Sequence, residues 1–158
     1  MAVEATLGTR LRHLLQLLDG GVERSYLAAG LVDYRPRYTP VVRALQAHGP
    51  LSIRSLADAA GLSHSALSQT VAQMERAGWV RTEPDSDARS KRVLMSPALI
   101  EALPLLAGHW EATARAAAGL DREIGAALAD VAAAAIAALE RRPFDDRIRH
   151  AIPKRGKK

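Results

Sequence analysis

The sequence predicts a mainly α-helical protein with one small β-hairpin. Three observations carry this prediction: long stretches with apolar residues at helical spacing, two consecutive helix-start signals separated by a glycine, and a change of period after Gly78. A chain of 158 residues is long enough for one domain of ordinary size with a usable core. Because 48% of its residues are hydrophobic and only 4% aromatic, we expect a core of Ala, Leu and Val.

Residues 51–77 are predicted to form two short helices joined by a tight corner. Ser52 and Ser63 are good N-cap residues, because a serine oxygen can accept a hydrogen bond from an unpaired amide of the first turn. A leucine before each serine and another in the turn that follows form hydrophobic staples. Gly61 and Gly78 stand where a left-handed residue ends a helix. This pattern is typical of a helix-turn-helix.

The second of these helices separates an apolar stripe from hydrogen-bonding side chains. Leu67, Val71 and Met74 fall at i, i+4 and i+7, so one face can pack on a core. Gln69 and Gln73 lie one turn apart and can present amides to base edges, while serines suit base or phosphate contacts. The candidate DNA contacts of this helix are Ser63, His64, Ser65, Ser68, Gln69, Gln73 and Arg76.

A basic hairpin is predicted to follow. Residues 79–83 and 91–95 are short and partly β-branched, and a polar loop separates them. A hairpin with arginine near its tip can reach the minor groove while the preceding helix occupies the adjacent major groove. Helix-turn-helix and hairpin together make a winged helix, whose basic candidate DNA contacts are Arg81, Arg89, Lys91 and Arg92.

The run GLSHSALSQTVAQMERAGWVRTEPDSDARSKRVLMS resembles the winged-helix core of the MarR family of bacterial transcription regulators. The resemblance covers residues 38–96, and its most specific part is Gly78-Trp79-Val80 followed by Asp87-x-Arg89 and a basic strand. It implies that the helix after Ser63 reads the major groove and that Arg89, held by Asp87, enters the minor groove. It also implies a homodimer formed by the terminal helices, a near-palindromic operator in double-stranded DNA, and an effector pocket between these helices and the winged helix.

The flanking segments are predicted to be helical. Residues 6–18 have a strong leucine pattern, and Gly20-Gly21 either ends or bends this helix before helical character resumes to residue 29. Further helices are expected at 38–48, at 97–118 with a kink or restart at Pro104, and at 121–142. The expected division is an N-terminal dimerisation helix and loop (1–37), the winged helix (38–96), C-terminal dimerisation helices (97–142) and a basic tail (143–158).

The positive charge lies mainly at the C-terminal end. Residues 141–158 contain eight Lys or Arg and two Asp or Glu, a net of +6 in a chain whose total is +5. Residues 51–95 contain six Lys or Arg and five Asp or Glu. A basic tail can add sequence-independent phosphate contacts. The alternative is a solvated, disordered end that touches nothing.

The effector of such a regulator would need a pocket with amphipathic aromatic side chains, which suit a small apolar or aromatic ligand with a polar group. The alternative role of each candidate is to fill the core. The absence of cysteine excludes disulfides and thiolate metal sites, and the five histidines show no metal-ligand spacing, so no metal or cofactor is expected. The pocket candidates are Tyr26, Tyr34, Tyr38, His109 and Trp110.

The sequence therefore predicts a sequence-specific DNA-binding transcription regulator, a homodimeric repressor released or modulated by a small molecule. Repression, rather than activation, of transcription is what the resemblance implies, and activation is the alternative. Other candidates are an architectural DNA-binding protein without sequence preference and a winged-helix protein-interaction module. No nucleophile with a base, paired carboxylates or phosphate loop indicates an enzyme. Without a signal-peptide pattern or a long apolar run, the chain is expected in the bacterial cytoplasm, on the nucleoid when bound to DNA.

Overall fold

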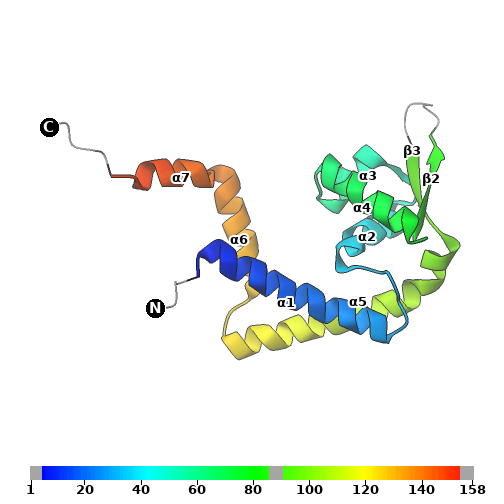
Figure 1. The fold of residues 1–158 in the computed structure, drawn as a ribbon, viewed down its shortest axis with the longest axis horizontal. Helices are drawn as coiled ribbons and strands as arrows, with labels where there is room; N and C mark the ends of the chain where they lie inside the picture. Colours follow the sequence, from blue (N-terminus) through cyan, green and yellow to red (C-terminus); the bar gives the residue numbers. More distant parts are fainter. Residues whose placement is uncertain (1–4, 86–90, 154–158) are drawn as a thin grey trace. The chain divides into compact units, whose positions relative to one another are not determined.

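The chain forms two compact units, Met1–Glu111 and Ala112–Lys158. The computed structural model describes residues 5–85 and 91–153 (Figure 1). The first unit confirms the predicted fold class, since it is mainly helical and holds a helix-turn-helix followed by a β-hairpin. Its elements are α1 (Leu7–Ala28), η1 (Pro36–Tyr38), α2 (Thr39–His48), β1 (Leu51–Ser52), α3 (Ile53–Ala60), α4 (His64–Arg76), β2 (Val80–Pro84), β3 (Lys91–Met95) and the first part of α5 (Pro97–Ile124).

The hairpin belongs to a three-stranded antiparallel sheet rather than standing alone. The strand order is β1-β3-β2, with Leu51 opposite Val93 and Thr82 opposite Val93 on the other side. β1 leaves no signal in the sequence, because a strand of two residues is too short to show alternation. β1 joins the entrance of α3 to the base of the hairpin, so the helix-turn-helix and the wing share a sheet.

The caps of α3 and α4 are those that the sequence predicts. Ser52 Oγ accepts a hydrogen bond from the Ser55 amide at 3.2 Å, and Ser63 Oγ accepts one from the Ala66 amide at 3.2 Å. Gly61 ends α3 with a φ of +66°, a conformation that side chains with a Cβ rarely adopt. The tight corner between the helices therefore follows from local sequence.

A second turn ties α4, β2 and α5 together. Gly78 has a φ of +79°, and the Trp79 amide reaches back to the Met74 carbonyl at 2.8 Å. Ser96 Oγ donates to the Gly78 carbonyl at 2.6 Å and accepts from the Leu99 amide at 3.1 Å. The first turn of α5 is thus bound to the turn from which the wing departs.

One core fills the first unit. The apolar stripe predicted for α4 is confirmed, because Leu67, Val71 and Met74 are all buried. They pack with buried side chains from the other elements of this unit, among which Leu56, Val93, Leu99 and Leu106 are fully enclosed. At about 1.5–3 kcal/mol for each large apolar side chain removed from water, this core holds α4 firmly and leaves its opposite face to solvent.

Several predicted helix limits are corrected. α1 is continuous across Gly20-Gly21, and α5 contains Pro104 and continues to Ile124. α6 (Leu128–Arg141) begins later than the predicted residue 121, because Gly125 with a φ of +70° ends α5. Asp121 then contributes a cap, its Oδ1 accepting from the Leu128 amide at 3.0 Å.

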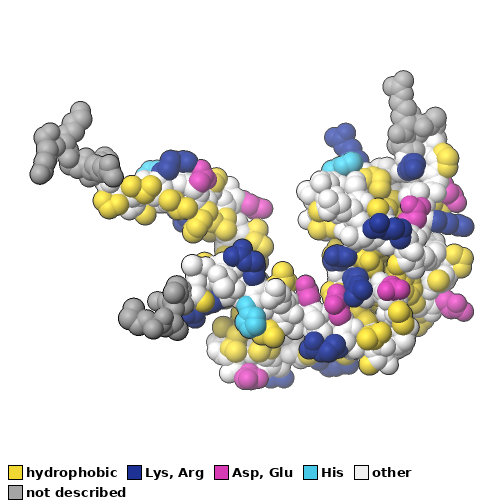
Figure 2. All heavy atoms as spheres, in the orientation of Figure 1, with side chains coloured by type: hydrophobic (Ala, Val, Ile, Leu, Met, Phe, Trp, Pro, Cys, Tyr) yellow, Lys and Arg dark blue, Asp and Glu magenta, His cyan; other side chains and the backbone are white. Residues whose placement is uncertain are grey.

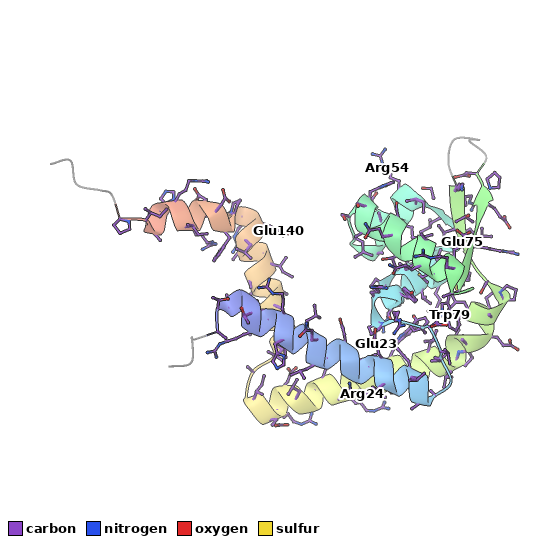
Figure 3. The ribbon with its side chains drawn as sticks, in the orientation of Figure 1. Glu23, Arg24, Arg54, Glu75, Trp79 and Glu140 are labelled. Atoms are coloured by element: carbon purple, nitrogen blue, oxygen red, sulfur yellow. The ribbon has the colours of Figure 1, made fainter. Side chains whose placement is uncertain are left out.

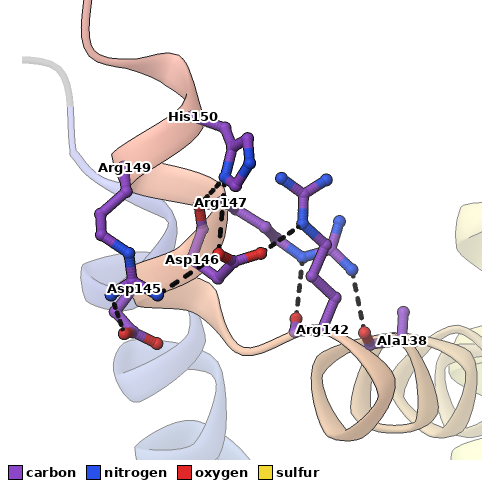
Figure 4. A network of polar contacts seen from close by, with 7 residues as sticks. All are labelled: Ala138, Arg142, Asp145, Asp146, Arg147, Arg149 and His150. Atoms are coloured by element: carbon purple, nitrogen blue, oxygen red, sulfur yellow. Dashed lines mark hydrogen bonds and ion pairs between the residues drawn. The ribbon is translucent and has the colours of Figure 1, made fainter.

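Part of the predicted basic tail is a helix, α7 (Phe144–Ala151). Arg142 donates to Asp146 at 2.8 Å and Arg149 to Asp145 at 2.5 Å, both at i, i+4 spacing (Figure 4). Arg147 Nη2 donates to the Ala138 carbonyl at 2.9 Å, which links α7 to α6. The Arg142 hydrogen bond holds the pKa of Asp146 below its ordinary value. These cations are engaged within the second unit, and residues 154–158 lie outside the described part of the chain.

Both units expose apolar stripes. On α1, Leu7, Leu11, Leu15 and Leu18 follow helical spacing and are all exposed. On α7, Phe144, Ile148 and Ile152 form a stripe, and Figure 2 shows hydrophobic side chains along one side of this helix with charged side chains on the other. No helix among residues 5–85 and 91–153 is long and apolar enough to cross a membrane.

Candidate nucleic-acid interface

The exposed face of α4 is a narrow stripe opposite its buried face. Ser65, Gln69, Ala72 and Arg76 are exposed and fall at i, i+4, i+7 and i+11. With 3.6 residues per turn, this spacing places them on one side of the helix, away from the core. Such a surface has the width and the hydrogen-bonding groups that a major groove accepts.

The two glutamines of α4, which have the same chemistry, differ in their exposure. Gln69 is exposed, whereas Gln73 is half-buried. Gln73 Oε1 is buried and has no hydrogen-bond partner among the described residues. Of the remaining α4 candidates, Ser63 is the N-cap, His64 is exposed and Ser68 is half-buried.

The wing carries exposed basic side chains. Arg81, Lys91 and Arg92 are all exposed. Arg81 Nε lies 3.7 Å from a Glu83 carboxylate oxygen, an exposed pair in which each side chain is free to reorient. Arg92 Nη2 donates to the Pro50 carbonyl at 3.0 Å, so this guanidinium is attached to the loop before β1. The predicted contacts Asp87 and Arg89 lie outside the described residues.

A carboxylate on α4 braces the wing. Glu75 Oε1 accepts hydrogen bonds from the Thr82 amide at 3.1 Å and from Thr82 Oγ1 at 2.8 Å. Glu75 is not among the predicted site residues, because an exposed acid at the end of a helix is common. Its role depends on β2 passing the last turn of α4, which only the folded chain shows.

Arg54 is another basic residue that the sequence analysis does not consider. It is exposed in the first turn of α3, and Figure 3 shows its side chain pointing away from the neighbouring elements. In helix-turn-helix proteins the first helix crosses the DNA backbone while the second enters the groove. The position of Arg54 in the first predicted helix is therefore the feature of the sequence that could have identified it as a candidate phosphate contact.

Three of the predicted pocket residues, Tyr26, Tyr34 and Tyr38, are buried in the core. Tyr34 makes edge-to-face contacts with Tyr26 at 5.0 Å, with Tyr38 at 5.7 Å and with Trp79 at 5.5 Å between ring centroids. Burial raises the pKa of the Tyr34 phenol well above its ordinary value. His109 on α5 packs on Tyr26 at 5.4 Å, and its Nδ1 lies 3.2 Å from Ser25 Oγ. This aromatic cluster joins α1, η1 and α5 to the start of the wing.

Trp110, the fifth candidate, is half-buried and packs against the same core. The Arg43 guanidinium of α2 stacks over its ring at 4.9 Å, and its indole Nε1 is buried without a hydrogen-bond partner among the described residues.

A cavity of about 320 Å³ opens beside the cluster, at the C-terminal half of α1 and the loop that follows. Tyr34 is among its lining residues, and the other four candidates are not. Two arginines give it a polar rim, Arg24 and Arg35, and Arg35 lies 3.6 Å from a Glu23 carboxylate oxygen. Leu27, Leu31 and Val32 are its large apolar lining residues.

Residues 32–90 match the sequence model of the MarR family. Among curated proteins, no sequence matches this chain significantly. Among solved structures, a M. tuberculosis transcriptional regulator, MOSR, in complex with DNA is 20% identical over 87% of this chain and 99% of its own, with a TM-score of 0.66. AbsC, a MarR family transcriptional regulator from Streptomyces coelicolor, is 23% identical over 94% and 99%, with a TM-score of 0.52. NadR in complex with 4-hydroxyphenylacetate is 18% identical over 88% and 95%, with a TM-score of 0.53. These similarities show a shared fold.

Proposed function

Because residues 32–90 match the sequence model of the MarR family, we propose that this chain is a sequence-specific DNA-binding transcription regulator that acts as a homodimer. The observation that carries the proposal is the exposed polar stripe of α4, set opposite a fully packed face and beside a basic hairpin. A helix fixed on one side and polar on the other is what major-groove recognition requires.

Each protomer places α4 in one major groove. Arg76 at the end of α4 and Arg54 at the start of α3 are exposed cations that contact the flanking phosphates. The wing lies along the neighbouring minor groove, where Arg89 enters and Arg81, Lys91 and Arg92 add positive charge. Asp87 orients Arg89 in this arrangement, as the family resemblance implies.

The homodimer forms through the exposed apolar stripes. The α1 stripe of Leu7, Leu11, Leu15 and Leu18 is the kind of contiguous apolar surface that soluble proteins use for association. Two winged helices related by a two-fold axis read a near-palindromic operator.

A small apolar or aromatic effector acts on the buried aromatic cluster. Tyr26, Tyr34, Tyr38 and His109 connect α1 and α5, the helices expected at the dimer interface, to Trp79 at the base of the wing. A ligand that displaced these rings, or reached Trp110 beside them, would change the separation of the two recognition helices. NadR, which shares this fold, was crystallised with a small phenolic acid. The protein acts as a cytoplasmic repressor under this proposal, which assigns it no catalytic step.

The test is a fluorescence-anisotropy titration of the full chain against the DNA upstream of its own gene, with a scrambled duplex of equal length, at two salt concentrations. The proposal requires tighter binding to the upstream duplex, and loss of affinity in Arg54→Ala and Arg76→Ala but not in Arg122→Ala, whose exposed arginine lies in the second unit. Equal, strongly salt-dependent binding to both duplexes would indicate an architectural protein. Analytical ultracentrifugation must give a dimer that Leu11→Glu dissociates.

A further inference from the structure

We propose, on the basis of the DNA-binding function above, that Gln69 and Ala72 select the operator sequence. Gln69 reads the adenine of an A·T base pair, and Ala72 packs on the methyl group of an adjacent thymine. Each operator half-site therefore contains an A/T step at the centre of the α4 footprint.

The placement of the two residues is the first step. Gln69 and Ala72 occupy the middle of the exposed stripe, with Ser65 toward one end of α4 and Arg76 at the other. Side chains three apart on a helix are neighbours, so Gln69 and Ala72 share one patch of surface. The middle of a straight helix laid in a curved groove lies nearest its floor, where the base edges are.

The chemistry of each side chain is the second step. A glutamine amide offers one donor group and one acceptor, which match N7 and N6 of adenine in the major groove. Guanine presents two acceptors there, and only one half of the amide can satisfy them. Ala72 has no polar side-chain atom, and the apolar group that the major groove offers is the thymine methyl.

Gln73, the other glutamine of α4, is not available for the same contact. A bidentate contact to adenine needs both amide atoms at the surface. Gln73 is half-buried and its Oε1 is enclosed, so its acceptor is directed into the protein. Gln69 is exposed and can present both atoms. The structure thus selects one of two residues with the same chemistry.

The experiment is repeated selection of a randomised duplex library by the full chain, run in parallel for wild type, Gln69→Ala and Gln73→Ala. We expect a symmetric motif with an A·T pair in each half-site. In Gln69→Ala the preference for that pair falls about tenfold, while the other positions keep theirs. Gln73→Ala, the matched control one turn away, keeps the wild-type motif.

Modified bases then test each contact on the selected duplex by anisotropy. Replacing the adenine with 7-deazaadenine should weaken wild type about tenfold and leave Gln69→Ala unchanged. Replacing the adjacent thymine with deoxyuridine removes only a methyl group and should weaken both proteins by a smaller factor. The inference would be wrong if the selected motif changed in Gln73→Ala but not in Gln69→Ala. It would also be wrong if neither modified base changed wild-type affinity. Either result would leave the proposed regulatory function intact. If wild type enriched no sequence at all, the proposed function would fail and this inference with it.

Discussion

Glu75 and Thr82 connect α4 to the wing. The Glu75 carboxylate, near the end of α4, accepts both the backbone amide and the hydroxyl of Thr82 in β2, at 3.1 and 2.8 Å. The two elements are the ones proposed to enter adjacent grooves of DNA. Because both bonds tie Thr82 of β2 to the last turn of α4, we expect them to help fix the angle at which the wing meets the minor groove.

Two substitutions of Glu75 should separate the effect of its hydrogen bonds to Thr82 from the effect of its negative charge. Glu75→Gln and Glu75→Ala both remove a negative charge close to DNA, but glutamine retains an acceptor for Thr82. We expect Glu75→Ala to bind the operator about fivefold more weakly than Glu75→Gln, which corresponds to about 1 kcal/mol for the lost hydrogen bonds. Anisotropy at one fixed salt concentration measures the difference. Equal affinities for the two variants would show that the wing is held by the sheet alone.

Ser63→Ala should destabilise the protein by about 1 kcal/mol, because the Ala66 amide loses the side-chain oxygen that caps it. Urea denaturation followed by circular dichroism measures the change in the free energy of unfolding. Ser65→Ala is the matched control, since Ser65 lies two residues on, is exposed and makes no cap. A Ser65→Ala loss as large as that of Ser63→Ala would contradict the capping account.

Tyr34 should make the protein sensitive to alkali. Burial raises the pKa of its phenol in the folded state above the unfolded value of about 10. The folded chain then keeps a proton that the unfolded chain releases, so this contribution to stability is complete below pH 10 and falls as the pH rises beyond it. The loss is about 1.4 kcal/mol per pH unit. Urea unfolding at pH 8 and pH 11 should show a smaller alkaline loss for Tyr34→Phe than for wild type.

Asp146 should make α7 sensitive to acid. The hydrogen bond from Arg142 lowers the pKa of its carboxyl, so the stabilising contribution is present above the unfolded pKa of about 3.9 and disappears as the pH falls through the lower folded value. NMR Cα shifts of residues 144–151 should report less helix in Asp146→Asn than in wild type at pH 7. The two proteins should converge near pH 2. A difference that persisted unchanged in acid would mean that the carboxylate does not hold α7.

Much of the recognition helix was predictable because its signals are local. The caps at Ser52 and Ser63, the left-handed glycine at Gly61 and the buried stripe of Leu67, Val71 and Met74 all depend on residues within a few positions of one another. Such short-range hydrogen bonds and periodic burial leave a direct pattern in the sequence. α7 was missed because its i, i+4 ion pairs occur in a segment whose overall charge is typical of a tail.

The order of the winged-helix elements, the helix caps and the chemical types of the exposed side chains follow from local sequence. The tertiary structure decided which of those side chains are free to act. It enclosed Gln73 Oε1 and left Gln69 exposed, attached Arg92 to the Pro50 carbonyl, and placed Glu75 beside Thr82. It also gathered three tyrosines and Trp79 into one cluster. The reason is physical: exposure and pairing are set by neighbours that are distant in the chain, and a side chain's own type does not encode them.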